Sequence, residues 1–206
     1  MLNATTWGWT DPKGQRKLLS VKDYIFWSYS VLTVSRIIMN RERIGQPIPY
    51  SGGRTKAANI MMSKYLKGDL RITDLDRDDA LSQRAAPICA HFGCVASSYH
   101  LDHLIPRSKL NGHHVALNQV LSCPRCNLSR RDSELMAWHR RNKTFPSLGV
   151  LRRYLKLCHV YSEQFGYLDQ NIGDALQQGL PFDPRNLPRK FPPVEHLVWD
   201  YAWPDL

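Results

Sequence analysis

The sequence predicts an α+β protein that is predominantly helical, with a small β-hairpin module in the middle of the chain. Apolar residues recur at helical spacing on both sides of this module, whereas residues 88–131 hold four of the five cysteines and five of the eight histidines. We therefore expect three parts: an N-terminal helical region over 1–85, a metal-bound core over 86–145, and a C-terminal helical region with a proline- and aromatic-rich tail over 146–206.

Helical periodicity is clearest in the two flanks. In the N-terminal flank we expect a helix from Ser20, which can cap it, to Glu42. In order along the chain, the further helices are expected over 55–67, 74–81, 148–165 and 173–178, and an irregular arm over 1–17. In the middle we expect two short strands, then a helix that begins near Cys126 and continues over 133–141.

The chain is strongly basic. It has 28 lysines and arginines against 18 acidic residues, a net charge of +10, and nine of the basic residues but only two acids fall between Arg125 and Lys156. Basic side chains release condensed counterions when they contact phosphates, so this balance favours a polyanion as partner. A solvated helix face is the alternative explanation for the basic stretch.

No targeting or membrane-spanning segment is recognisable in the sequence. Residues 1–10 lack an apolar core, and the most apolar stretch, residues 24–39, is interrupted by serines, a threonine and an arginine. We therefore expect a cytoplasmic protein, in which cysteines serve as metal ligands or free thiols more often than in disulfides.

Four cysteines are spaced as two zinc knuckles. Cys89 and Cys94 form a C-x4-C pair, and Cys123 and Cys126 form a tighter C-x2-C pair. Structural Zn²⁺ takes four such ligands in a tetrahedron, so we expect one structural Zn²⁺ ion here. The alternatives are four unrelated buried thiols, or His91 as a substitute ligand. Cys158 falls on the apolar stripe of a later helix and is expected in the core.

The segment between the knuckles carries the residue types that phosphodiester hydrolysis requires. Asp102 and His103 are adjacent, Asn118 precedes an apolar run, and Asn127 follows Cys126. Imidazole is a base near neutral pH, and carboxylate and amide oxygens suit a hard cation such as Mg²⁺. Each residue alone has a structural explanation; their joint occurrence between two knuckles predicts a nuclease site.

These motifs resemble the HNH endonucleases, a family with a ββα-metal fold. The resemblance rests on the stretches Leu101-Asp-His-Leu-Ile-Pro-Arg-Ser-Lys109 and Leu117-Asn-Gln-Val-Leu-Ser-Cys-Pro-Arg-Cys-Asn127, followed by Leu-Ser-Arg130, and it covers residues 88–132. It implies that His103 is the general base, that Asp102 and Asn127 hold a catalytic Mg²⁺ or Mn²⁺ ion, and that Asn118 orients the histidine and braces the loop. The products would be 5′-phosphate and 3′-hydroxyl ends.

The chain departs from the usual family pattern at three points. The third motif residue is Asn127 where many members have histidine, the first knuckle is C-x4-C, and the loop after Lys109 reads Leu-Asn-Gly-His-His. His113 and His114 in that loop are interpreted as solvent-exposed, with contact to DNA or metal as the alternative. His100 is either a strand surface residue or a substrate contact.

Five arginines are the predicted nucleic-acid contacts: Arg125, Arg130, Arg131, Arg140 and Arg141. Trp138, next to them, is expected in the core, with base stacking as the alternative. The aromatic tail that ends at Trp203 is the candidate docking segment for a protein partner.

The leading functional hypothesis is a DNA endonuclease that nicks or cuts both strands. The second is a zinc-stabilised nucleic-acid-binding module without catalysis. The third is a nuclease subunit that needs a partner protein, such as an ATPase subunit. Small HNH proteins of this size resemble restriction or phage-defence nucleases, which suggests that setting by analogy. The sequence gives no indication of oligomeric state.

Overall fold

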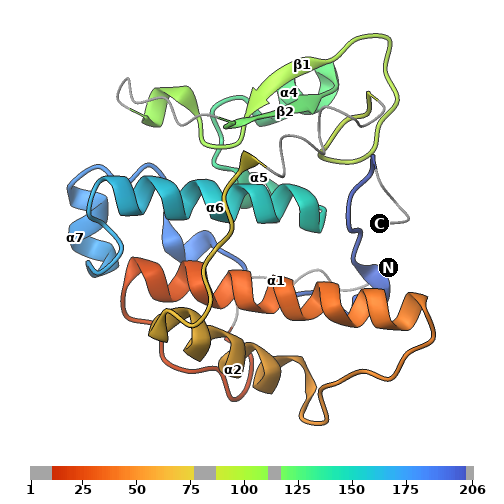
Figure 1. Cartoon of the computed structure of the whole chain (residues 1–206). Coiled ribbons are helices and arrows are strands. Elements are labelled where there is room, and N and C mark those ends of the chain that lie inside the picture. Colours follow the sequence, from red (N-terminus) through yellow and green to blue (C-terminus); the bar gives the residue numbers. More distant parts are fainter. Residues whose placement is uncertain (1–10, 77–86, 111–116, 203–206) are drawn as a thin grey trace.

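The computed structural model describes residues 11–76, 87–110 and 117–202, and shows a helical frame that carries a small β-hairpin module (Figure 1). Six α-helices and one two-stranded antiparallel sheet occur in these ranges, so the predicted α+β, mainly helical fold class is confirmed. The N-terminal part of the predicted arm, the end of the helix predicted over 74–81, His113, His114 and Trp203 lie outside the described residues.

The frame begins with α1 (Val21–Arg43), which packs against both α2 (Gly53–Lys67) and α6 (Leu148–Gln164). As predicted, Ser20 caps α1: its side chain accepts a hydrogen bond from the Asp23 backbone, and the Asp23 carboxylate accepts one from the Ser20 backbone. The shorter α7 (Ile172–Gln177) follows α6 at one end of the frame (Figure 1). None of the helices in the described ranges is long and apolar enough to cross a membrane.

A late segment of the chain closes over α1. The Trp27 indole N–H donates to the carbonyl of Arg189 at 2.8 Å, and the Ser28 hydroxyl donates to the carbonyl of Pro188 at 2.7 Å. Both side chains are on α1 and have no exposed surface. A small hydroxyl at position 28 lets the later backbone approach α1 closely and satisfies one of its buried carbonyls.

The hairpin module consists of β1 (His100–His103), β2 (Gln119–Ser122) and α4 (Pro124–Arg130), together with the cysteine loop over 87–99. The strands pair in the register His100 with Ser122 through His103 with Gln119. A two-stranded hairpin is marginal in water by itself. Leu104, Ile105, Leu110 and Val120 of this region join the main hydrophobic core of the frame, so burial supports the hairpin from below.

One continuous helix was predicted from near Cys126 through residues 133–141. This prediction is wrong, because the chain forms two separate helices there. Helix α4 ends at Arg130, and Arg131 adopts a positive φ of 49°. A second helix, α5 (Leu135–Arg141), starts at Glu134, whose carboxylate accepts hydrogen bonds from the backbone of Met136 and Ala137. The same carboxylate accepts a hydrogen bond from the hydroxyl of Tyr154 on α6, which ties α5 to the frame.

The tail over 198–202 binds back onto the chain. The backbone N–H groups of Leu148 and Gly149 donate to the carbonyls of Val198 and Trp199 at 2.8 and 2.7 Å. Gly149 allows this close approach: a Cβ atom there would lie 2.3 Å from the Asp200 carboxylate, which would have to shift. Trp199 also lies under the Arg36 guanidinium, at 4.7 Å. Trp199, in the tail predicted as a docking segment, is thus half-buried against its own chain, and docking of a partner by the tail remains a prediction.

Candidate functional site

The four cysteines predicted as zinc ligands come together at one point. The sulfur atoms of Cys89, Cys94, Cys123 and Cys126 all lie within 4.8 Å of one another. A tetrahedral site with Zn–S bonds of about 2.3 Å needs sulfurs about 3.8 Å apart, so the cluster is close to the required size. Thiols are the ligands that structural zinc prefers, and the four residues therefore fit a structural Zn²⁺ ion.

Local backbone geometry explains how the looser first knuckle still converges. The Gly93 N–H donates to the Cys89 carbonyl at 2.8 Å, and the Cys89 N–H donates to the Cys94 carbonyl at 3.2 Å, which closes the loop on itself. Gly93 has a φ of +64°, and a Cβ atom there would lie 2.7 Å from the Tyr201 ring. The tail therefore packs directly on this knuckle, and glycine satisfies both the turn and the close contact.

The surroundings of the cysteines are apolar and aromatic. Cys89, Cys123 and Cys126 form a small cluster with the buried Trp138, and Phe92 and Tyr99 pack against it. Trp138 is 1% exposed and its indole N–H donates to Ser129, which confirms it as a core residue. Cys158 belongs to the main core instead, as predicted, and burial raises the pKa of its thiol well above the ordinary value.

Burial and mutual contacts shift the thiol pKa values in opposite directions. Burial and the neighbouring sulfurs raise the pKa of Cys94 and Cys126. For Cys123 burial also raises the pKa, but hydrogen bonds from the other three cysteines outweigh it, so its pKa is lowered. A metal ion is the partner that lets all four sulfurs carry negative charge together.

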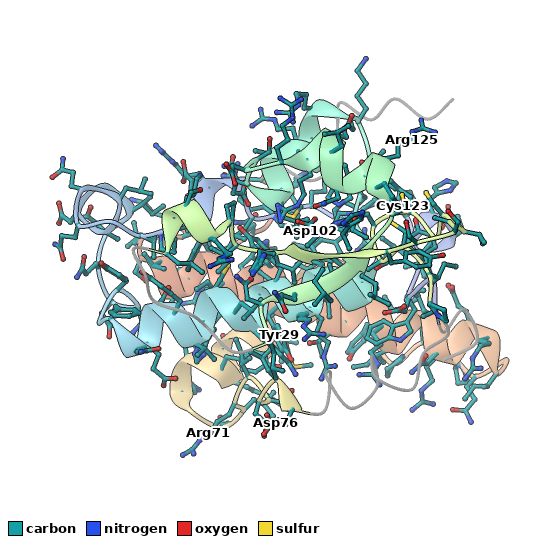
Figure 2. The ribbon with its side chains drawn as sticks, turned by 90° about the horizontal axis from the view of Figure 1, so that it is seen from above. Tyr29, Arg71, Asp76, Asp102, Cys123 and Arg125 are labelled. Carbon is teal, nitrogen blue, oxygen red and sulfur yellow. The ribbon has the colours of Figure 1, made fainter. Side chains whose placement is uncertain are left out.

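Asp102 is a buried carboxylate of the module with two side-chain partners. It is 5% exposed, and its Oδ2 atom accepts hydrogen bonds from Nε2 of His91 at 2.8 Å and from Nε of Arg130 at 3.0 Å. Figure 2 shows Asp102 on β1, next to α4. Both contacts use Oδ2, and Oδ1 has no hydrogen bond to any residue that the structure describes. His91, considered above as a substitute zinc ligand, is directed to this carboxylate instead.

Arg130 is the second half of this buried ion pair. Its side chain has no exposed surface, and besides Asp102 it donates to the carbonyls of His103, Leu104 and Ser133. Burial lowers the pKa of Arg130, while the negative charge of Asp102 opposes that effect. The predicted phosphate contact of Arg130 is wrong, because every donor-bearing surface of the guanidinium faces the protein interior.

His103 lies at the end of β1 and is half-buried. Its Nε2 atom is 3.0 Å from the amide nitrogen of Gln119, its cross-strand partner. An amide N–H donating to Nε2 assigns the ring proton to Nδ1. Gln119 carries no motif signal, and only the register of the hairpin places it beside the histidine.

Asn118 fixes the backbone that follows His103. Its side-chain oxygen accepts from the Ile105 N–H at 2.9 Å and its amide donates to the Ile105 carbonyl at 2.8 Å, while its own carbonyl accepts from Leu104. The side chain is 3% exposed. This is the bracing role that the resemblance implies. The orienting effect on His103 remains a prediction, and the hydrogen bonds of Asn118 reach the backbone of residues 104–105.

Asn127 sits in the first turns of α4, half-buried, three residues before Arg130. Residues three apart share one helix face, so Asn127 lies on the side of α4 that Arg130 directs to β1. No hydrogen bond to its side-chain amide is found among the described residues. The amide oxygen is therefore available to a ligand from the same side as Asp102.

The remaining predicted arginines are exposed. Arg125, Arg131, Arg140 and Arg141 all lie on the surface of the module and of α5, and Arg141 donates to the Ser133 hydroxyl. Figure 2 shows Arg125 pointing away from the molecule at the rim of α4. His100 is also exposed, on β1. Because they are exposed, these arginines can contact a large anion such as a nucleic acid. The buried Arg130 cannot.

One comparison with known proteins gives a match. Residues 87–133 match the HNH endonuclease family. The matched segment begins two residues before Cys89 and ends three residues after Arg130, so it includes both knuckles, both strands and α4. The match indicates a metal-dependent nuclease domain in general terms. No curated protein and no solved structure matches the chain.

Proposed function

We propose that this protein is a metal-dependent endonuclease that hydrolyses DNA phosphodiester bonds, with His103 as the general base. The observation that carries the proposal is the joint placement of Asp102, His103, Asn118 and Asn127 on one braced hairpin and helix inside the HNH segment. A structural Zn²⁺ ion on the four cysteines holds that hairpin and helix together.

His103 takes a proton from the attacking water. The lone pair on Nε2 points to the Gln119 amide in the resting structure. Gln119 is exposed, so its side chain can swing away when water and a phosphate enter. Asn118 keeps the backbone after His103 in place when Gln119 moves, because its three hydrogen bonds hold residues 104–105. The imidazole thus stays in place while its hydrogen-bond partner changes.

Asp102 and Asn127 are the residues that would hold the catalytic ion. Arg130 and His91 fix one carboxylate oxygen, which leaves Oδ1 of Asp102 and the amide oxygen of Asn127 as ligands, with water completing the shell. A bound Mg²⁺ or Mn²⁺ ion supplies charge neutralisation at the phosphate and at the departing 3′ oxygen. The products are 5′-phosphate and 3′-hydroxyl ends.

DNA is proposed as the substrate from the resemblance to the HNH endonucleases, and the exposed arginines that flank the motif support a nucleic-acid partner. Arg125 and Arg131 lie at the two ends of α4, and Arg140 and Arg141 end α5. A phosphate backbone that runs from one helix to the other would meet all four. A protein partner such as an ATPase subunit, and a restriction or phage-defence setting, remain predictions from the resemblance alone.

The first test is cleavage of supercoiled plasmid in Mg²⁺ or Mn²⁺. We expect the parent protein to convert the plasmid to nicked or linear form. His103→Ala should lose cleavage by about 100-fold or more, because general-base catalysis contributes on that scale. His196→Ala is the matched control: His196 is exposed and lies in the short 3₁₀ turn Val194–His196, outside the module, so its removal should leave cleavage unchanged.

Two results would contradict the proposal. Equal cleavage by the parent and His103→Ala would rule out His103 as the base. Binding of plasmid without cleavage by the parent, in either metal, would favour the zinc-stabilised binding module or a nuclease that needs its partner. Adding candidate ATPase partners to the inactive parent then separates those two alternatives.

A further inference from the structure

A histidine that no motif singles out contacts the proposed active site from the zinc knuckle. His91 lies between Cys89 and Cys94, has no exposed surface, and places Nε2 at 2.8 Å from Oδ2 of Asp102. The two residues belong to different structural units, the cysteine loop and strand β1, so the contact joins them across the module.

The position of His91 is set by the backbone and by packing. The N–H of Ala90, the preceding residue, donates to the Leu121 carbonyl on β2 at 2.8 Å. The imidazole packs edge-on against Trp138, with ring centroids 5.1 Å apart. His91 is the second of the four residues between the two cysteines of the C-x4-C knuckle, so the longer knuckle loop carries it against the module. The unusual spacing therefore has a structural use.

We propose that His91 is a positioning residue for Asp102, through which the zinc knuckle sets the affinity of the active site for its catalytic ion. The inference rests on the proposed function and deepens it. Arg130 reaches Oδ2 from α4 and His91 reaches the same atom from the cysteine loop. With donors on both sides, the carboxylate plane cannot rotate, and Oδ1 stays directed to the ion.

Losing one donor frees the carboxylate without removing its negative charge. Arg130 alone still pairs with Asp102, so the ion pair and the fold persist, but the carboxylate regains rotation about its Cβ–Cγ bond. Groups that orient metal ligands in this way are worth about 10- to 100-fold in metal affinity or activity. The expected defect is thus one of ion binding, with the zinc site intact.

The test compares variants at His91 in the full-length protein. His91→Phe keeps a ring against Trp138 and removes the donor; His91→Gln keeps a donor near the position of Nε2. His91→Asn is polar but too short to reach Asp102, and it serves if the phenylalanine variant does not fold. His139→Phe is the matched control, because His139 is equally buried and packs on the same Trp138, yet bonds to Thr144 instead of Asp102.

Three quantities are measured for each variant: zinc content, Mn²⁺ affinity by electron paramagnetic resonance, and the Mg²⁺ concentration that gives half-maximal plasmid cleavage. Asp102→Ala gives the baseline for Mn²⁺ bound elsewhere. We expect full zinc content throughout, a 10- to 100-fold weaker Mn²⁺ affinity and a matching rise in half-maximal Mg²⁺ for His91→Phe or His91→Asn, and recovery of most of the loss in His91→Gln. His139→Phe should match the parent.

The outcomes separate the inference from the proposed function. Unchanged Mn²⁺ affinity in His91→Phe and His91→Asn, with cleavage intact, would overturn the positioning role and leave the nuclease standing. Zinc loss in proportion to the defect would also overturn it, in favour of a purely structural role. A parent that binds Mn²⁺ in a His91-dependent way without cleaving DNA would support His91 and refute a nuclease that acts without a partner. A parent that neither binds Mn²⁺ nor cleaves would overturn both.

Discussion

At the scale of single residues, the module is organised around one buried negative charge. Asp102 is enclosed, and its charge is balanced by Arg130, which is itself fully buried. A buried ion pair contributes little net stability relative to apolar residues, but breaking it is costly because one charge is left without a partner. Stability and ligand geometry therefore depend on the same pair.

Arg130→Gln should destabilise the protein strongly. We expect a loss of about 3–5 kcal/mol in the free energy of unfolding, measured by urea denaturation, because the Asp102 carboxylate stays buried without its cation. Arg131→Gln, one position on and exposed, is the control and should change stability by less than about 0.5 kcal/mol. Equal stability of Arg130→Gln and the parent would show that Asp102 gains another partner or becomes protonated.

His139 should make stability sensitive to mild acid. Burial lowers its pKa from 6.5 to about 3, and the charges of His91 and Arg130 act in the same direction. Between these values the unfolded chain binds a proton that the folded chain does not, so stability is present above pH 6.5 and is lost as the pH falls toward 3. The expected contribution is about 2 kcal/mol between pH 7.5 and pH 5.

The measurement compares urea midpoints of the parent and His139→Phe at pH 7.5 and pH 5. Acid effects on the cysteines and carboxylates are common to both proteins, so the difference between them isolates His139. The parent should lose more stability on acidification than the variant. Identical losses would mean that His139 is protonated in the folded protein as readily as in the unfolded chain.

For single residues, the sequence predicts the roles that short motifs encode, but not the contacts that depend on the three-dimensional fold. The knuckles could be found because zinc ligands often come in pairs a few residues apart, and the Asp-His pair because it is part of a short motif between them. His91 and Gln119 could not, because their contacts depend on the fold of the cysteine loop and on the strand register. The phosphate contact predicted for Arg130 failed for the same reason: its burial follows from how α4 lies on β1.

At the scale of elements, the break between α4 and α5 places the two helices independently. No glycine or proline occurs between Arg130 and Leu135, so periodicity predicts one continuous helix there. In the structure α4 ends at Arg130, Arg131 turns the chain with a φ of 49°, and the buried Arg130–Asp102 contact holds this end of α4 against β1. Glu134 then starts α5 and binds Tyr154 of the frame. A tertiary contact thus overrides the local preference.

The zinc cluster should hold the hairpin elements more than the frame. Cys126→Ser should abolish zinc binding, and the amides of β1 and β2 should then exchange with deuterium at least about 10-fold faster, because two short strands are marginal without added support. Amides of α1 and α6, which pack on each other, should change far less.

Cys158→Ala is the control for that experiment, since Cys158 is equally buried on α6 but belongs to the main core. It should keep full zinc content. Zinc content that survives in Cys126→Ser, together with unchanged exchange in β1 and β2, would refute the four-cysteine site.

At the scale of the whole molecule, the family-like segment is set on a helical frame whose role the sequence does not reveal. Both flanks were predicted as helical from periodicity, and the structure agrees for α1, α2, α6 and α7. Their arrangement was not predictable, because contacts between residues some 160 positions apart carry no local signal. The predicted division into three regions remains a prediction, and one core joins residues from all of them.

The exposed arginines should supply the salt dependence of DNA binding. Replacing Arg125, Arg131, Arg140 and Arg141 by glutamine should weaken binding and reduce the slope of log affinity against log salt by about 0.9 for each arginine that meets a phosphate. The measurement is fluorescence anisotropy with a DNA duplex over a range of salt concentrations. Arg71→Gln is the control, because Arg71 is exposed at the edge of the molecule opposite Arg125 (Figure 2). An unchanged slope in the fourfold variant would place the DNA on another face.

The hydrogen bonds from Trp27 and Ser28 to the carbonyls of Arg189 and Pro188 can form only late in synthesis, after residues 188–189 have been added. A ribosome adds about 5–20 residues per second, so roughly 8–30 s pass between synthesis of α1 and of the segment that covers it. All four cysteines of the candidate zinc site are made within that interval. A nascent chain can therefore bind its metal while the face of α1 that carries Trp27 and Ser28 is still exposed to water. In this interval that apolar face is available for aggregation and for binding by chaperones.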